Sequence, residues 1–378
     1  MRALKVLPVS VVALVMSLWA VSARAQVSTE PPPSIAFDHA GLAREALEKH
    51  IRPGYAALSE AARALAKSLD GYCARQTAER RRGVDRSFDG LVTAWGRIEH
   101  IRFGPVTIEN RLERLFFWPD RRGLGARQIE QTLRARDPEA ADPEKLAAKR
   151  IAIQGLGALE VALFDAPAAK SATEADRVYR CIYAKAIAGN VANIAGAIHK
   201  EWTAPDLYVR HWLAPGEGNP HYLKPSETTL ALAKSLDNGL ERVRDEWIAG
   251  PLGFGPTRRR LTPVLSKSRR TLRYMRAGLD GIHHLYLIAG MHKAIVDTAA
   301  AHPQVTVPLN AKLVLSEIET ARTGVQRLVR QGKPFDADAM MQPFVAIGFP
   351  LRNARQHLTA LLGLTAGISM GFNATDGD

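Results

Sequence analysis

Two carboxylates on apolar helix faces are the residues of this sequence whose types and positions best suit chemistry. Glu99 follows Trp95 by four residues, so on a helix it continues the same apolar stripe. Glu160 lies between Leu156 and Phe164, inside a second apolar arc. A buried carboxylate destabilises a fold unless a cation, a hydrogen-bond donor or a metal compensates it. We therefore expect function near these two side chains.

The sequence leaves two interpretations of these carboxylates open. In the structural one, Glu99 pairs with Arg102, and Glu160 accepts a hydrogen bond from a second arginine or from the backbone. In the other, Glu99 and Glu160 face the same interior as ligands of a metal or polar molecule, since helix bundles commonly build such sites from inward-facing Glu and His. Arg102 would then orient Glu99. His100 would join them only if the helix unwinds near Gly104.

The N-terminus has the pattern of a secretory signal peptide. Arg2 and Lys5 supply a positive end, residues 6–21 an apolar core, and Ala23-Arg-Ala25 a small-residue cleavage pattern. We therefore expect residues 1–25 to be removed and the mature protein to lie in the cell envelope, which is the periplasm in a Gram-negative host. No later stretch is apolar over the length of a membrane span, so we expect none.

The chain is basic, with a formal charge of +13, and removing the three basic residues of the leader leaves +10. For an exported protein, nucleic acid is excluded as the expected partner, and an anionic envelope component or an envelope protein is the better candidate. The second half would bind it. Its densest basic run contains Arg258, Arg259, Arg260, Lys267, Arg269, Arg270, Arg273 and Arg276. A solvated helix face is the competing interpretation.

Cys73 and Cys181 are the only cysteines. In an oxidising compartment such a pair predicts one disulfide. The bond would close a loop of about 109 residues, worth ~4–5 kcal/mol in the chain-entropy model.

The apolar pattern predicts an all-α fold of two helical-bundle domains. Proline and glycine break the helical pattern over residues 203–226, which we take as a linker. The first bundle then covers residues 36–202 and the second covers residues 227–378. Convincing strand alternation is absent from the sequence.

The helices that carry the carboxylates have recognisable boundaries. The Glu99 helix is expected to run to Gly104-Pro105, and the Glu160 helix to begin at Asp142-Pro143. His283 and His284 are adjacent and would face different directions, so they are interpreted as core or surface histidines.

Four segments of the chain resemble the imelysin family, in its branch of exported bacterial proteins. They are Trp95 to Pro105, Phe116-Phe-Trp-Pro-Asp-Arg-Arg-Gly123, Gln154-Gly-Leu-Gly-Ala-Leu-Glu160 and Gly371-Phe-Asn-Ala-Thr-Asp-Gly-Asp378. The resemblance implies two helical bundles, an envelope location and a link to iron or other metals. Founding members of the family were described as metallopeptidases.

The chain departs from the family's hallmark Gly-x-His-x-x-Glu. Gly155 and Glu160 match, but Gly157 stands where the histidine would be. Histidine and glutamate at that spacing lie on neighbouring ridges of a helix and can reach one cation, whereas Gly157 offers no ligand and lowers helix propensity by up to ~1 kcal/mol. Trp95, Asp120 and the two glycines would only support the site.

We therefore expect a non-catalytic exported protein that binds a divalent metal ion (iron, zinc or copper) or a metal-loaded ligand. The alternatives are an imelysin-type metallopeptidase and an envelope scaffold for an anionic partner. The sequence contains no His-Glu-x-x-His motif, no P-loop and no Gly-x-Ser-x-Gly elbow.

Overall fold

The computed structural model describes residues 36–165, 173–254, 260–300 and 307–369. The expected signal peptide, the tail from Gly371, and Arg258 and Arg259 of the basic run lie outside these ranges.

The described part of the chain is helical and contains no strand, so the predicted all-α class is confirmed. The α-helices are α1 (His39–Ala46), α2 (Arg52–Ala74), α3 (Ala78–Ile98), α4 (Arg111–Leu115), α5 (Leu124–Ala135), α6 (Pro143–Leu146), α7 (Leu156–Phe164), α9 (Glu174–Thr203), α10 (Tyr208–Leu213), α11 (Pro225–Glu241), α12 (Gly250–Leu252), α13 (Thr271–His283), α14 (Met291–Ala300), α15 (Val307–Arg330) and α16 (Met341–Ala366). Three π-helical segments join some of them: η1 (Leu47–Ile51), η4 (Arg242–Ala249) and η5 (His284–Ile288). Two 3₁₀ segments complete the set: η2 (Gly104–Asn110) and η3 (Ile151–Ile153).

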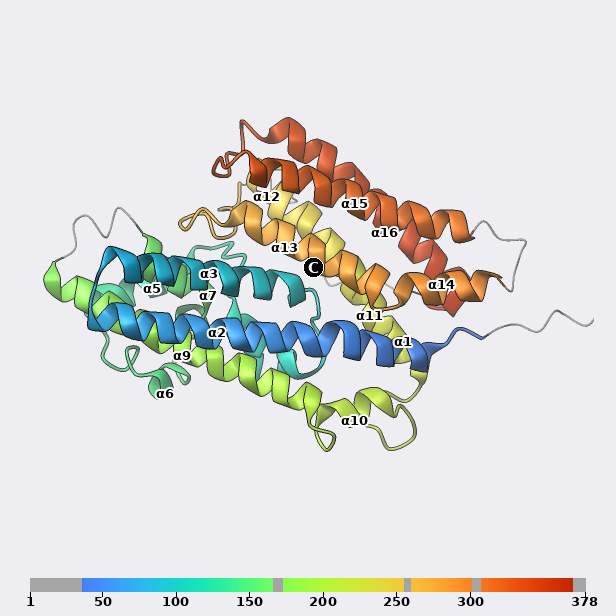
Figure 1. Ribbon diagram of the computed structural model, residues 1–378, viewed down its shortest axis with the longest axis horizontal. Helices are drawn as coiled ribbons and strands as arrows, with labels where there is room; N and C mark the ends of the chain where they lie inside the picture. The colour runs from blue at the N-terminus through green and yellow to red at the C-terminus, as the bar shows by residue number, and fades with distance from the viewer. Residues whose placement is uncertain (1–35, 166–172, 255–259, 301–306, 370–378) are drawn as a thin grey trace, which may run out of the picture. The chain divides into compact units, whose positions relative to one another are not determined.

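The helices form two bundles, as the sequence predicts. In the first, α2 packs against α3 and α9, and α7 packs against α9; in the second, α15 packs against α13 and α16, and α16 against α11. Helix α3 packs along α13, which joins the bundles over a shared apolar core (Figure 1). Glycine makes this contact close, because a Cβ at Gly281 would lie 2.0 Å from the carbonyl oxygen of Arg97.

The segment expected to be a linker, residues 203–226, contains α10 and contributes to the core. Trp212 of α10 is fully buried, and its indole N–H donates a hydrogen bond of 2.9 Å to the carbonyl of Ala43. Residues 35–378 form one compact unit. The exact domain boundary therefore stays a prediction.

A disulfide joins Cys73, near the end of α2, to Cys181 in α9, with the two Cα atoms 5.7 Å apart. The predicted pairing is confirmed. It ties together two long neighbouring helices of the first bundle.

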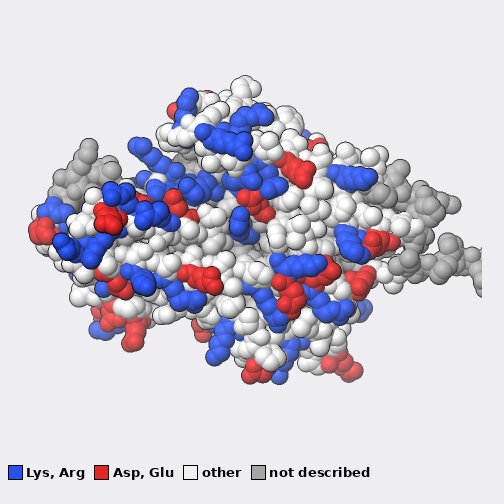
Figure 2. Space-filling model, in the orientation of Figure 1, with Lys and Arg blue, Asp and Glu red and all other residues white. Residues whose placement is uncertain are grey.

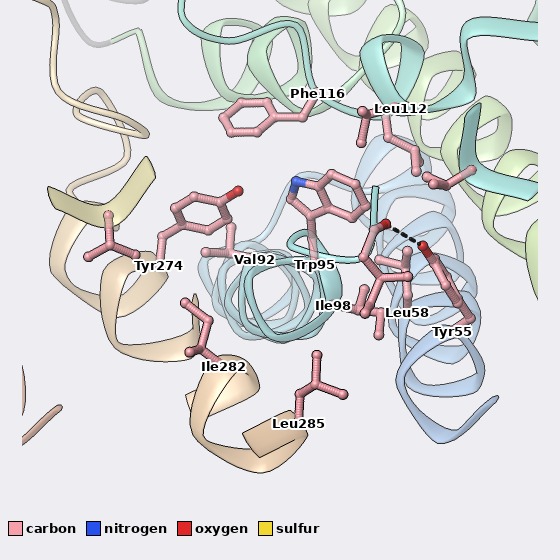
Figure 3. Packing of buried hydrophobic residues seen from close by; sticks show 14 of the residues in the cluster. Tyr55, Leu58, Val92, Trp95, Ile98, Leu112, Phe116, Tyr274, Ile282 and Leu285 are labelled. Atoms are coloured by element: carbon pink, nitrogen blue, oxygen red, sulfur yellow. Dashed lines mark hydrogen bonds between the residues drawn. The ribbon is translucent and has the colours of Figure 1, made fainter. Parts of the chain in front are cut away.

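The Glu99 helix ends earlier than the sequence predicts. Helix α3 stops at Ile98, and Glu99 is its capping residue. The hydroxyl of Tyr55 in α2 donates a 3.1 Å hydrogen bond to the carbonyl of Ile101, and the side chain of Ile101 is buried (Figure 3). These contacts hold the chain in a turn away from the helix axis.

The expectation of one helix from Asp142 to Glu160 is wrong. Helix α6 ends at Leu146, and Glu160 lies on the separate helix α7, which Gly155 precedes as the capping residue. At Gly155 the backbone presses against the end of α4, because a Cβ there would lie 2.3 Å from the carbonyl oxygen of Arg114. This close approach fixes where α7 begins.

By length and composition, one helix of the described residues, α9, is apolar enough to cross a membrane. Most of its apolar window is buried inside the molecule, where α9 packs on α2 and α7. Core helices pass the same test, so α9 is weak evidence for a membrane span.

Candidate functional site

Glu99 lies in an ion network where the two bundles meet. The side chain is buried, and its carboxylate is 3.4 Å from Arg102 Nη1 and 3.3 Å from Arg242 Nη2. The Arg102 pair is the one that the structural interpretation predicts. Arg242 comes from η4 in the other half of the chain, so Glu99 links the bundles as well as closing its own helix.

The network extends to one of the family-like segments. Arg242 Nη1 is 2.9 Å from Glu246, and Glu246 is 3.4 Å from Arg121 of the loop after Phe116. Burial alone would lower the pKa of Arg242, but the charges of Glu99 and Glu246 outweigh it, so the pKa is raised. Each buried charge of the network therefore has an opposite charge beside it.

Trp95 and Tyr274 close the network on the apolar side. Their indole N–H and hydroxyl groups point toward each other between α3 and α13, with Phe116 above them (Figure 3). Phe116 packs edge-to-face on Tyr274, with ring centroids 5.8 Å apart. Burial, followed by the charge of Glu99, raises the pKa of Tyr274 well above its usual range, so this hydroxyl stays protonated.

Glu160 is held differently. Its side chain is 7% exposed, and one carboxylate oxygen, Oε1, accepts two hydrogen bonds of 2.7 Å from the backbone N–H and the hydroxyl of Ser268. Burial raises the pKa of Glu160, while the two Ser268 bonds and the nearby charges of Lys267 and Arg270 oppose the rise. The carboxylate has neutral donors but no direct ion pair among the described residues.

Glu160 opens onto a cleft of about 190 Å³ that two of the family-like segments line together with α5 and residues 261–267. Asp120, Gly157 and Lys267 are among the residues that line it, together with Phe116, Trp118 and Pro119. We call this hollow the motif cleft. A side chain at position 157 would have room there, because a Cβ would come no closer than 3.9 Å to the carbonyl oxygen of Phe117.

Hydrogen bonds hold the walls of the motif cleft in place. One oxygen of Asp120 accepts a 2.9 Å hydrogen bond from the N–H of Ala126, in the first turn of α5. On the other wall, Arg114 Nε donates to the side-chain oxygen of Gln154 at 2.9 Å, and the Asn190 amide donates to the Gln154 carbonyl at 3.2 Å. These bonds fix the chain just before Gly155.

The predicted site residues thus fall into two groups. Glu99, Arg102 and Trp95 lie in the ion network, while Glu160, Gly155, Gly157 and Asp120 belong to the motif cleft or its frame. Glu99 and Glu160 have different partners. We therefore place the candidate ligand site at Glu160 and assign a structural role to Glu99.

His100 belongs to neither group. Its ring is buried, and Nε2 lies 3.0 Å from Nε2 of His50, whose Nδ1 is 3.1 Å from Nδ1 of His284. Burial lowers the pKa of His100 to about 3, so the ring is neutral. The chain does turn after Ile98, but it takes His100 toward these histidines rather than toward Glu160.

Sequence reasoning missed Ser268, Arg242 and His50. Each lies at least 50 residues away from its partner in the sequence, and none stands in a recognisable motif. The acid-free basic run near Ser268 was the one available signal, because a buried glutamate favours neighbouring cations.

The motif cleft does not have the ligand set of a tightly bound metal ion. Within the ranges that the structure describes, no group of three or more His, Cys, Asp or Glu side chains is placed to hold one. Glu160 and Asp120 supply carboxylate oxygens, and each already accepts a hydrogen bond from the protein. A metal entering here would need further ligands from elsewhere.

Comparison with known proteins supports the fold and the family resemblance. The family model described as imelysin matches residues 51–342 of this chain. Among curated proteins, none matches it.

Two solved structures share the architecture. An imelysin-like protein from Psychrobacter arcticum 273-4 superposes with a TM-score of 0.70 at 17% identity, over 89% of this chain and 100% of that one. A proposed iron-regulated protein A precursor from Parabacteroides distasonis ATCC 8503 gives a TM-score of 0.69 at 12% identity, over 89% and 97%.

Proposed function

Because the chain belongs to the imelysin family, we propose that it is an exported, non-catalytic protein of the cell envelope that binds a metal already held by another ligand. The single observation behind this proposal is Glu160. Its buried carboxylate faces the motif cleft without a direct ion-pair partner in the described chain, next to the space that Gly157 leaves open.

The cargo is a chelated metal rather than a bare ion because the protein offers too few ligands. Divalent transition metals usually take four or more ligands, and histidine is prominent among them. Glu160 and Asp120 can supply two at most. A chelate brings its own donors and leaves one or two positions for a protein carboxylate.

Export of the protein is supported by the basic and apolar pattern of its N-terminal residues and by its imelysin relatives. The iron link rests on the Parabacteroides protein, which is described as iron-regulated.

A peptidase is the weaker alternative. It would need a metal, a metal-bound water and a general base, and Gly157 removes the histidine that the family motif would provide. We expect no cleavage of unfolded polypeptides above background with added zinc or iron. Robust metal-dependent cleavage that disappears in Glu160→Ala would favour the peptidase instead.

Calorimetric titration tests the binding proposal. The probes are ferrous, zinc and cupric ions alone, and zinc bound to nitrilotriacetate, which leaves coordination positions open. We expect wild type to bind the zinc chelate, and Glu160→Gln to weaken this binding while the helical circular-dichroism spectrum is unchanged.

Gly157→His is the matched gain-of-ligand variant, because it restores the family spacing at a position with room for a side chain. It should bind zinc ions more tightly than wild type. If neither wild type nor Gly157→His binds any probe, the metal-binding proposal fails.

A further inference from the structure

A second hollow lies between the bundles, outside the motif cleft. It is a groove of about 840 Å³ bordered by η1, α2 and α3 on one side and by α13, η5 and α15 on the other. We call it the basic groove. Its volume is in the range of small-molecule sites, which is about 300–1,000 Å³.

Small residues make the groove hollow. Gly54, Ala57 and Ala61 share one face of α2, and Gly90 and Ala94 share one face of α3. At Gly90 no atom lies within 4 Å of where a Cβ would be. Gly90 therefore leaves room that a larger side chain would fill, whereas Gly54 packs closely, because a Cβ there would lie 2.5 Å from Cδ1 of Ile98.

Basic side chains surround this floor. The lining includes six cationic residues and two acidic ones, an excess of four positive charges; they are Lys49, Arg86, Arg97, Arg273, Arg276 and Arg322, with Asp89 and Asp280. Figure 2 shows Lys and Arg gathered over the seam between α3 and α13. Just outside, Glu45 pairs with Lys49 and Glu319 with His283.

Two of the arginines are fixed in position. Arg276 Nε is 2.9 Å and Arg322 Nη2 is 2.8 Å from the same oxygen of Asp280. A carboxylate shared by two guanidinium groups orients both while leaving net positive charge. Arg86 and Arg97 have no ion pair or side-chain hydrogen bond within the described chain, so they are free to meet a ligand.

This arrangement revises the view of the basic run as a solvated face. Several of its members pair with acids from distant segments: Lys267 with Asp165, Arg270 with Asp89, and Arg260 with Asp338. Arg273 and Arg276 line the groove, where they pair with its two acids: Arg273 with Asp89 at 3.3 Å and Arg276 with Asp280 at 2.9 Å. The lining of this groove still carries four more positive than negative charges.

His50 and His284 form part of the floor. Burial, followed by the charges of Arg97 and His283, lowers the pKa of His284. The positive charge of the groove thus favours the neutral form of His284. A neutral imidazole in the floor can donate or accept a hydrogen bond.

We infer that the basic groove binds a small polyanion with several carboxylate or phosphate oxygens, held by Arg97, Arg273, Arg276 and Arg322. Guanidinium groups bind such oxygens through paired, charge-assisted hydrogen bonds. A groove of this volume with small residues in its floor suits a compact ligand better than a polymer that runs across the surface.

The test is calorimetry on the mature chain in metal-free buffer at low salt, with citrate and pyrophosphate as probes. At least one should bind, and Arg97→Gln combined with Arg273→Gln should weaken binding by about tenfold or more. Gly90→Leu should weaken it similarly, because the leucine side chain would occupy the floor. Binding of only one probe assigns the carboxylate or the phosphate class, and binding of both assigns general polyanion recognition.

Two matched control variants lie on α3, the helix that carries Gly90 and Arg97. Arg82→Gln removes an exposed arginine outside the groove, and Gly83→Leu adds the same side chain where a Cβ also meets no atom within 4 Å. Both should bind as wild type does, as should Glu160→Gln in the motif cleft. The inference is overturned if wild type binds neither probe, or if the groove variants bind as tightly as these controls.

Discussion

Two buried glutamates of this protein, Glu99 and Glu160, show how different surroundings separate a structural carboxylate from a candidate ligand. Glu99 is 2% exposed and lies between Arg102 and Arg242, and its network continues through Glu246. Glu160 is 7% exposed, and among the described residues its carboxylate receives the two hydrogen bonds of Ser268 alone, both on one oxygen.

The difference assigns their roles. A carboxylate between two guanidinium groups has its charge balanced, and removing one partner leaves an uncompensated charge in the interior. A carboxylate with neutral donors keeps part of its charge available. Glu99 therefore links the bundles through its ion pairs, whereas Glu160 is the carboxylate for which we propose a ligand in the motif cleft.

The largest effect is expected for Arg242→Met. It leaves Glu99 with Arg102 alone, whose side chain is 31% exposed, and leaves Glu246 with Arg121. We expect the free energy of unfolding to fall by about 3–5 kcal/mol, as measured by urea denaturation. Arg102→Met is the matched control and should cost less; an equal loss in both variants would mean that the link between the bundles carries no special weight.

The next largest effect is expected from removing the disulfide, which ties together two helices of the bundle that carries Glu160. Replacing both Cys73 and Cys181 by alanine frees a long loop in the unfolded chain. The free energy of unfolding should fall by about 2–4 kcal/mol, in thermal or urea melts. Wild type treated with a reductant should match the double variant, and a melt that neither change shifts would contradict the expected contribution.

Gly155→Ala and Gly157→Ala are a pair of variants that compares a tightly packed position with a position that faces open space in the motif cleft. The first places a Cβ 2.3 Å from the carbonyl oxygen of Arg114, whereas the second meets nothing closer than 3.9 Å. We expect Gly155→Ala to destabilise by about 1–3 kcal/mol, and Gly157→Ala to be neutral or to stabilise by up to ~1 kcal/mol. Equal melting temperatures would show that the wall of the motif cleft can move.

The smallest effect is the pH dependence from Glu160. Its pKa is raised in the folded protein, so the folded state binds this proton more tightly than the unfolded chain does. The resulting stabilisation is complete below the unfolded-state pKa and is lost as the pH rises through the folded-state pKa. Glu160→Gln should remove this fall while changing stability near neutral pH by less than about 1 kcal/mol.

Urea melts at several pH values from acidic to neutral measure this difference. Glu99→Gln is the comparison variant, since Glu99 lies in the ion network and not in the motif cleft. If Glu160→Gln leaves the slope of stability against pH as it is in wild type, the raised pKa assigned to Glu160 is wrong.

Much of the architecture could be predicted because it is local. The 3.6-residue pattern and the Pro and Gly breaks identified the long helices, and the cysteine pair identified a disulfide. The i,i+3 spacing of Glu99 and Arg102 predicted their ion pair. The helices and the ion pair depend on residues that are close in sequence. The disulfide could be predicted because the chain has two cysteines, which leaves one possible pairing.

The site was less predictable because its contacts are long-range. Ser268 reaches Glu160 across 108 positions of sequence, and no pattern near either residue indicates it. The separate start of α7 was missed for the same reason, since the contact of Gly155 with Arg114 is visible only after α4 and α7 are packed.

The three π-helical segments of the described chain change the direction in which the side chains of a helix face. His50 lies in η1, Arg242 begins η4 and His284 begins η5. A π turn accommodates about one residue more than an α turn, so the faces before and after it are rotated by about 100° relative to one another. Deleting one residue within η1 would let the backbone continue as α-helix but would turn His50 away from His100. The positions of His50 and His284 in the groove floor and of Arg242 beside Glu99 therefore depend on these π turns. Each π turn adds one residue and so lets a helix present different faces before and after it.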